Sequence, residues 1–225
     1  MATYDMILSN DLIDNPSPRC ACLVILDTSY SMNGTPIQEL NSGIQHFIAS
    51  VQEDEVASYS VEVAVISAGS SVTEILPFTT ANNIETIQPF SASGATPLGQ
   101  AVELALKRLE TRKQEYKKSG VAYYQPWLVI ISDGAPTDMD IFNRVAPQTH
   151  ALSTERKLVV LPIGVANANM QVLGQLSSRG AKKLDGLKFN EFFEWLSASM
   201  SRVSASASTS SSIQLPTTDS SDSIL

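Results

Sequence analysis

Three short segments of this 225-residue chain carry oxygen-bearing side chains at a spacing that could hold a hard cation. Asp27, Ser29 and Ser31 alternate along DTSYS, Thr96 lies in SGATPLG, and Asp133 follows the apolar run WLVII. Carboxylate and hydroxyl oxygens are the ligands that Mg²⁺ prefers, and these segments contain no His or Cys that would favour zinc or copper. We therefore expect a divalent cation site, with Mg²⁺ as the first choice and Mn²⁺ or Ca²⁺ as alternatives.

The apolar runs around these segments are typical of buried strands. The runs are rich in Val and Ile and do not alternate strictly with polar residues, as expected for strands covered on both faces. A more polar run follows the second of them after the short link SAGSS, which predicts a hairpin and an antiparallel edge strand. The predicted strands are 21–26, 61–66, 72–78, 127–131 and 158–163.

Helical periodicity fills the intervals between these strands. Apolar residues recur every three or four positions, which is the spacing of an amphipathic helix. Strands that alternate with helices predict a doubly wound, Rossmann-like open α/β sheet, with helices on both faces and five or six mostly parallel strands. The predicted helices are 36–52, 97–112, 138–153, 168–178 and 189–203.

This fold would bring the oxygen-bearing side chains together. Ligand sites of open parallel sheets form beyond the carboxyl ends of the strands, where DTSYS and Asp133 are expected. Residues two apart in extended backbone face the same way, so the side chains of DTSYS can converge on one point. Thr96 is predicted to be the N-cap of helix 97–112, with Pro97 as its first residue.

These segments resemble the metal-ion-dependent adhesion site of von Willebrand factor A and integrin inserted domains. DTSYS matches the Asp-x-Ser-x-Ser motif, and the Thr of SGATPLG and the Asp of ISDGAPTD occupy the positions of its two further members. The resemblance implies that Ser29 and Ser31 ligate the metal directly and that Thr96 does so directly or through water. It implies that Asp27 and Asp133 act mainly through bridging waters. The implied function is a module that binds an Asp or Glu of a protein partner, not an enzyme.

GATPLG and LVIISDGAPTD resemble one branch of this family in particular, the bacterial intracellular TerY-like proteins associated with tellurium resistance. That resemblance implies a stress-response system in which the module works with a protein kinase or a metal-dependent protein phosphatase.

Other interpretations of the same residues stay open. Asp27 and Asp133 could be turn residues at strand ends, and Thr96 could be a helix cap alone. A metal-dependent phosphatase or other hydrolase on the same scaffold is the alternative function, although Ser29 stands where an Asp-x-Asp nucleophile motif would need a second carboxylate. The basic residues within 107–118 are interpreted as a solvated helix end.

Composition limits the partner and the compartment. A formal net charge of −8 argues against nucleic acid as the main partner. No apolar stretch approaches the roughly 18 residues of a membrane span, and the acidic, proline-interrupted N-terminus does not resemble a secretion signal, so a cytoplasmic location is expected. The expected organisation is an N-terminal arm at 1–18, one domain at 19–203, and a disordered Ser/Thr-rich tail or linker at 204–225.

Overall fold

The sheet has the predicted doubly wound architecture. A computed structural model describes residues 12, 14–133, 136–184 and 188–206. Its six strands lie in the order β3-β2-β1-β4-β5-β6; β3 is antiparallel to β2, and all other neighbours are parallel. The strands are β1 Cys20–Asp27, β2 Val61–Ala68, β3 Val72–Thr80, β4 Trp127–Ser132, β5 Val159–Gly164 and β6 Lys182–Lys183.

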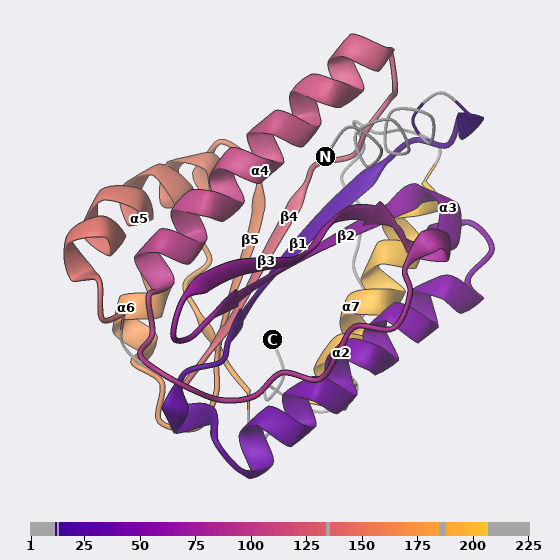
Figure 1. Cartoon of the computed structure of the whole chain (residues 1–225). Coiled ribbons are helices and arrows are strands. Elements are labelled where there is room, and N and C mark those ends of the chain that lie inside the picture. Colours follow the sequence, from indigo (N-terminus) through magenta and orange to yellow (C-terminus); the bar gives the residue numbers. More distant parts are fainter. Residues whose placement is uncertain (1–11, 13, 134–135, 185–187, 207–225) are drawn as a thin grey trace.

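Helices cover both faces of this sheet, with α2 and α7 on one face and α4, α5 and α6 on the other (Figure 1). Side chains of β1 alternate between the two cores, because successive residues of a strand point to opposite faces. The helices are α2 Thr35–Glu53, α3 Ala57–Ser60, α4 Leu98–Ser119, α5 Met139–Thr154, α6 Met170–Gly174 and α7 Phe189–Ser204, with 3-10 turns η1 Tyr30–Met32 and η2 Ala81–Asn83.

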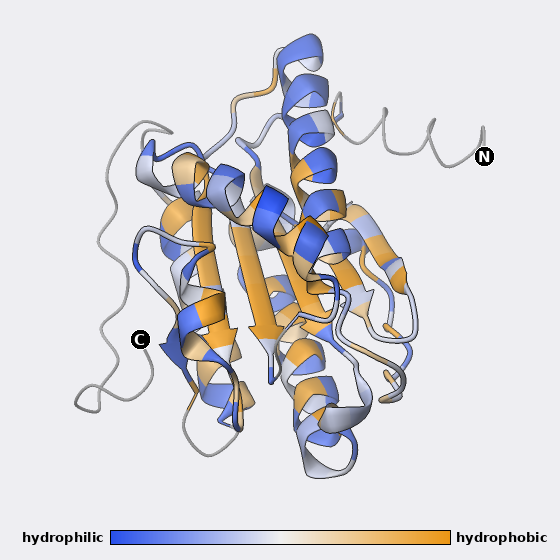
Figure 2. Ribbon diagram, turned by 90° about the vertical axis from the view of Figure 1, so that its left-hand side faces the viewer, coloured by the Kyte–Doolittle hydropathy of each residue, from blue (hydrophilic) through white to orange (hydrophobic). Residues whose placement is uncertain are grey.

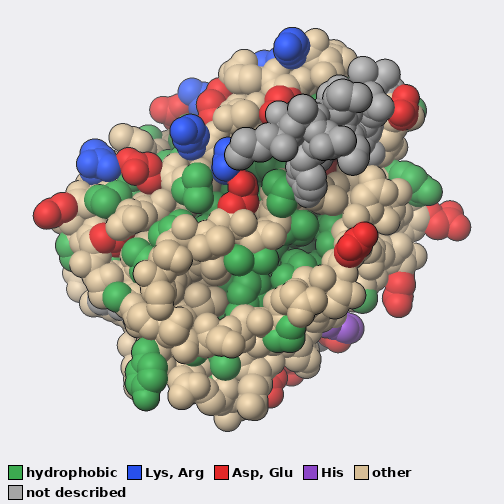
Figure 3. Space-filling model, in the orientation of Figure 1, with side chains coloured by type: hydrophobic (Ala, Val, Ile, Leu, Met, Phe, Trp, Pro, Cys, Tyr) green, Lys and Arg blue, Asp and Glu red, His purple; other side chains and the backbone are tan. Residues whose placement is uncertain are grey.

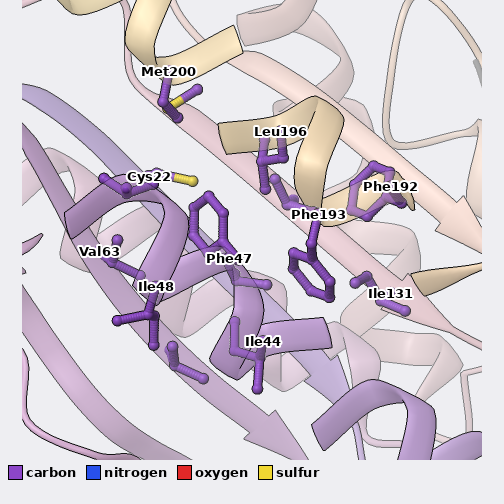
Figure 4. Packing of buried hydrophobic residues seen from close by; sticks show 14 of the residues in the cluster. Cys22, Ile44, Phe47, Ile48, Val63, Ile131, Phe192, Phe193, Leu196 and Met200 are labelled. Carbon is purple, nitrogen blue, oxygen red and sulfur yellow. The ribbon is translucent and has the colours of Figure 1, made fainter. Parts of the chain in front are cut away.

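Apolar side chains fill the space between the sheet and its helices. The central strands are hydrophobic along their length, and the helices turn their apolar stripes towards them (Figure 2). In the core beneath α2 and α7, Phe47 and Phe193 lie next to each other near Cys22, with ring centroids 5.7 Å apart (Figure 4). This packing holds the central strands in place, and their carboxyl ends form the candidate site.

Two helices differ in length from the predictions. Helix α4 does not end at 112 but continues to Ser119, because Arg112 and Tyr116 extend its buried face by one turn each. It ends where Gly120 takes a left-handed conformation, with φ of 69°, and donates its N–H to Lys117 and Tyr116. Helix α6 is shorter than predicted and covers only Met170–Gly174.

Arg112 corrects the interpretation of 107–118 as a solvated helix end. Its side chain is buried, and its Nε and Nη2 atoms donate to the two carboxylate oxygens of Glu62 at 2.7 and 2.8 Å. The Tyr116 hydroxyl donates to the same carboxylate. The half-buried Arg108 and Lys113 of α4 form ion pairs with Glu74 and Glu110. Figure 3 shows basic and acidic side chains interspersed on the face it displays. A buried ion pair therefore ties α4 to β2.

Replacing Arg112 by Met should lower the free energy of unfolding by about 3 kcal/mol, because the variant leaves the buried Glu62 carboxylate without its bidentate partner. Urea denaturation of the full chain measures this loss. Lys113→Met is the matched control, since Lys113 forms an ion pair with the exposed Glu110 and should contribute less than about 1 kcal/mol. Equal losses in the two variants would contradict the assignment.

The chain ends are described only in part. The predicted arm at 1–18 and tail at 204–225 lie largely outside the described residues. Within the described part, Leu12 is buried against the core formed by α4 and α5, and α7 extends to Ser204. Among the described residues, no helix combines the length and apolar character that crossing a membrane requires.

Candidate metal site

The candidate site lies at the carboxyl ends of β1 and β4, where the chain changes direction across the sheet. After β1 the chain continues to β2 on one side, and after β4 it continues to β5 on the other side. The two connections therefore leave the sheet in opposite directions, and open α/β sheets bind ligands at such a point. The parallel register pairs Leu26 with Ile131, so the next residues, Asp27 and Ser132, are neighbours.

Asp27 is fully buried and joins the two strand ends. One carboxylate oxygen accepts the backbone N–H of Ser29 at 2.9 Å, and the other accepts the Ser132 hydroxyl at 2.5 Å. The first bond shapes the turn that follows β1, and the second crosses to β4. Asp27 therefore sets the position of the two serines that follow it.

A hydroxyl chain connects DTSYS to Asp133. The Ser31 hydroxyl donates to Asp133 Oδ1 at 2.8 Å, and the Ser29 and Ser31 hydroxyl oxygens lie 3.0 Å apart. Because a hydroxyl has one proton to donate, the Ser29 hydroxyl donates to Ser31. Ser29 is 2% exposed and Asp133 is buried, whereas Ser31 between them is exposed, so the hydroxyl chain reaches the surface at Ser31.

The loop that carries Thr96 is held against DTSYS by backbone hydrogen bonds. Tyr30 donates its N–H to Gly94 at 3.0 Å, and Ser93 donates its N–H to Thr28 at 2.8 Å. Gly94 has φ of 75°, and a Cβ there would lie 2.5 Å from the Cα of Ser70, so only glycine fits without displacing the loop. Thr96 follows this junction and is buried.

The predicted capping role of Thr96 is wrong. Helix α4 begins at Leu98, and Pro97, not Thr96, occupies the N-cap position. No side-chain hydrogen bond from this cap residue reaches the helix. The amides of Gly99 and Gln100 instead donate to the carboxylate of Asp138, at 2.9 and 2.7 Å. Among the described residues, the Thr96 hydroxyl therefore takes no part in capping α4.

Sequence reasoning missed two residues that organise the site. Ser132 precedes Asp133 in the sequence and was visible at a strand end, but its bond to Asp27 depends on the register of β1 and β4. Asp138 stands directly before α5, which is an ordinary N-cap position, yet its side chain caps α4 instead. Only the packing of the two helix ends reveals that role.

The site is rich in carboxylates and hydroxyls and poor in positive charge. Neither Asp27 nor Asp133 takes part in the ion pairs found among the described residues. Burial, together with the negative charge of Asp27, raises the pKa of Asp133, while the hydrogen bond from Ser31 acts in the opposite direction. A divalent cation would supply the missing positive charge.

The oxygen spacing fits such a cation. Oxygens on neighbouring corners of an octahedron lie about 3.0 Å apart when the metal–oxygen bonds are about 2.1 Å. The serine oxygens have this separation, and Asp133 Oδ1 lies at a similar distance from Ser31. Within the described part of the chain, no three His, Cys, Asp or Glu side chains cluster as metal ligands, so a cation here would depend on hydroxyl groups.

In the metal-free protein, replacing Asp133 by Asn should raise the melting temperature at pH 7 by a few °C at most. The variant keeps an oxygen that can accept from Ser31 but removes a carboxylate that burial and Asp27 disfavour. Because folding raises the pKa of Asp133, wild type loses this group's contribution to stability as pH rises through the raised pKa. The difference in melting temperature between variant and wild type should therefore disappear in acid, below the ordinary pKa of an aspartate side chain.

Thermal melts in chelator between pH 3.5 and pH 7 test this expectation. Asp140→Asn, which removes an exposed acidic charge from the first turn of α5, is the matched control. A metal-free Asp133→Asn variant that melts well below wild type at pH 7 would contradict it.

Comparison with known proteins identifies the family of this chain. The family model described as von Willebrand factor type A domain matches residues 23–193. The chain belongs to this family. The match spans β1 to α7 and confirms the family-level resemblance seen in the motif. A comparison with curated proteins found no match to this VWA domain.

Solved structures share the VWA fold at low sequence identity. A von Willebrand factor type A protein from Catenulispora acidiphila matches with a TM-score of 0.64 and 14% identity, covering 82% of this chain and 43% of that one. The pilus adhesin SpaC from Lactobacillus rhamnosus GG, in its open conformation, has a TM-score of 0.64 and 13% identity, covering 82% and 30%. Proximal thread matrix protein 1 from the mussel byssus, solved with a zinc-occupied MIDAS motif, has a TM-score of 0.56 and 14% identity, covering 81% and 46%. This chain therefore spans less than half of each of these proteins.

Proposed function

We propose that this VWA domain binds one divalent cation, Mg²⁺ in the cell, and uses it to hold an acidic side chain of a protein partner. The observation that carries the proposal is the pair of serine hydroxyl oxygens at 3.0 Å, linked to Asp133 and held by the buried Asp27. Ser29, Ser31 and Thr96 would ligate the metal through their hydroxyls. Asp27 and Asp133 would hold the hydroxyls and bridging waters in place.

The chemistry of this ligand set favours an acidic partner. Neutral hydroxyl ligands leave most of the charge of the cation uncompensated, so it remains electrophilic. A carboxylate supplied by another protein would complete the coordination and form a charge-assisted contact. The exposed position of Ser31, in contrast to the buried Ser29, supports approach of the partner from the Ser31 side.

An exposed aromatic residue at the site supports the proposal that the partner is a protein. Tyr30 lies between the two serines and is 70% exposed, and its backbone is held by hydrogen bonds to Gly94 and Asn33. Large exposed aromatic side chains beside a polar centre are typical of binding hot spots. We infer that the partner presents an Asp or Glu with apolar residues around it.

We propose a binding role and not catalysis. The side chains that hydrogen-bond to the proposed ligands within the described residues are those of Ser and Asp. A phosphatase of the Asp-x-Asp class would need a second carboxylate at the position of Ser29. The described hydrogen-bond partners of the site also include no His, Cys or Lys that could activate a serine hydroxyl.

The wider setting of the proposal comes from sequence resemblance. GATPLG and LVIISDGAPTD support a place among TerY-like proteins, in a bacterial tellurium-resistance or stress system in the cytoplasm. A protein kinase or a metal-dependent protein phosphatase would then be the partner that supplies the acidic residue.

Affinity capture from the native cell tests this function. The full chain should retain a specific protein in Mg²⁺ and lose it in chelator, because the metal bridges the two proteins. Ser29→Ala should lose at least 90% of the captured protein even in Mg²⁺, since the variant removes a direct ligand. Ser71→Ala removes an exposed hydroxyl from the β2–β3 link and is the matched control. Equal capture in chelator and by Ser29→Ala would contradict the proposed function.

A further inference from the structure

The carboxylate of Asp138 bridges two helices at the edge of the candidate site. Asp138 occupies the N-cap position of α5, but its side chain makes no capping bond to α5. Its two oxygens accept the N–H groups of Gly99 and Gln100 in the first turn of α4. The amides of Ile141 and Phe142 in α5 donate to the Asp138 backbone carbonyl instead. One residue thus begins α5 with its backbone and caps α4 with its side chain.

The two helix ends touch closely at Gly99. A Cβ at that position would lie 2.5 Å from the backbone nitrogen of Phe142 and 3.0 Å from Asp138 Oδ2. Contacts this short would force the helix ends apart, because the first of these atoms belongs to the backbone. Glycine therefore permits the approach, and the Asp138 carboxylate holds it together.

A third hydrogen bond links this junction of α4 and α5 to the candidate ligand Thr96. Thr137 donates its backbone N–H to the carbonyl of Thr96 at 2.9 Å. The segment 137–138 is thus bonded to Thr96, Gly99 and Gln100 by hydrogen bonds of 2.7–2.9 Å. In the sequence, Asp133 lies five positions before Asp138, so the segment bonded to Thr96 follows Asp133 closely along the chain.

We infer that Asp138 is a positioning residue that fixes the Thr96 loop against the Asp133 loop, so that both can serve one cation. The inference rests on the proposed function and adds to it a residue outside the predicted ligand set. Groups that orient metal ligands without touching the metal typically change affinity 10- to 100-fold when removed. The Asp138 carboxylate also occupies the first amides of α4, so this helix N-terminus is not free to receive the partner's carboxylate in place of the metal.

Mn²⁺ affinity of the full chain tests this inference. Asp138→Ala should weaken Mn²⁺ binding at least 10-fold, as measured by titration calorimetry well below the melting temperature, with circular dichroism to confirm folding. Asp138→Asn keeps one oxygen that can accept an amide and should recover most of the affinity. Asp140→Ala removes the same charge two residues away, from an exposed side chain in the same helix turn, and should stay within about twofold of wild type.

Gly99→Ala provides a second variant if Asp138→Ala does not fold. It separates the same helix ends while the carboxylate remains, so it should also weaken Mn²⁺ binding at least 10-fold. Wild-type affinity in folded Asp138→Ala or Gly99→Ala, or an equal loss in Asp140→Ala, would overturn the positioning role alone. Failure of the wild-type protein to bind Mn²⁺ would overturn the proposed function, and this inference with it.

Discussion

The hydrogen bond from Ser132 to Asp27 connects the ends of two parallel strands whose chains then leave in opposite directions. The two serines and Asp133 are positioned by the residues of this junction. Asp27 shapes the turn that carries the two serines, and the residue after Ser132 receives the Ser31 hydroxyl. Asp27 is fully buried and hydrogen-bonded through both oxygens, so its position is fixed by both strand ends.

Concentrating oxygen atoms at one edge of the sheet has an electrostatic cost. Two carboxylates lie close together without a described basic partner. Burial, and to a smaller extent the negative charge of Asp27, raises the pKa of Asp133. By contrast, the buried Glu62 is balanced by Arg112, so the fold does neutralise buried acids elsewhere. The Glu62–Arg112 pair lies near the start of β2, at the opposite end of the sheet from Asp27. At the candidate site a bound cation would supply the compensating charge.

The sequence was sufficient to predict the fold, and it also predicted which strand ends would carry the candidate site. Val- and Ile-rich runs predicted the strands of the parallel sheet, and the link SAGSS predicted the antiparallel edge, because both signals are local. The convergence of DTSYS with Asp133 followed from strand ends meeting at one edge, and the hydroxyl chain agrees with it.

Features that depend on packing between distant segments were not predictable in the same way. The burial of Arg112 depends on Glu62 lying under α4, which no local pattern reveals. The cap of α4 comes from Asp138 at the start of another helix, so the local rule that assigned the cap to Thr96 failed. The ligand role of Thr96 itself remains a prediction, supported by the loop contacts that hold it beside DTSYS.

Whether one cation joins these loops can be decided by a crystal structure of the protein soaked with Mn²⁺, with anomalous scattering recorded. We expect one anomalous peak at about 2.1–2.2 Å from the hydroxyl oxygens of both Ser29 and Ser31, with Thr96 bound to the metal directly or through water. A well-occupied Mn²⁺ elsewhere on the protein, with these hydroxyls still bonded only to each other and to Asp133, would contradict it.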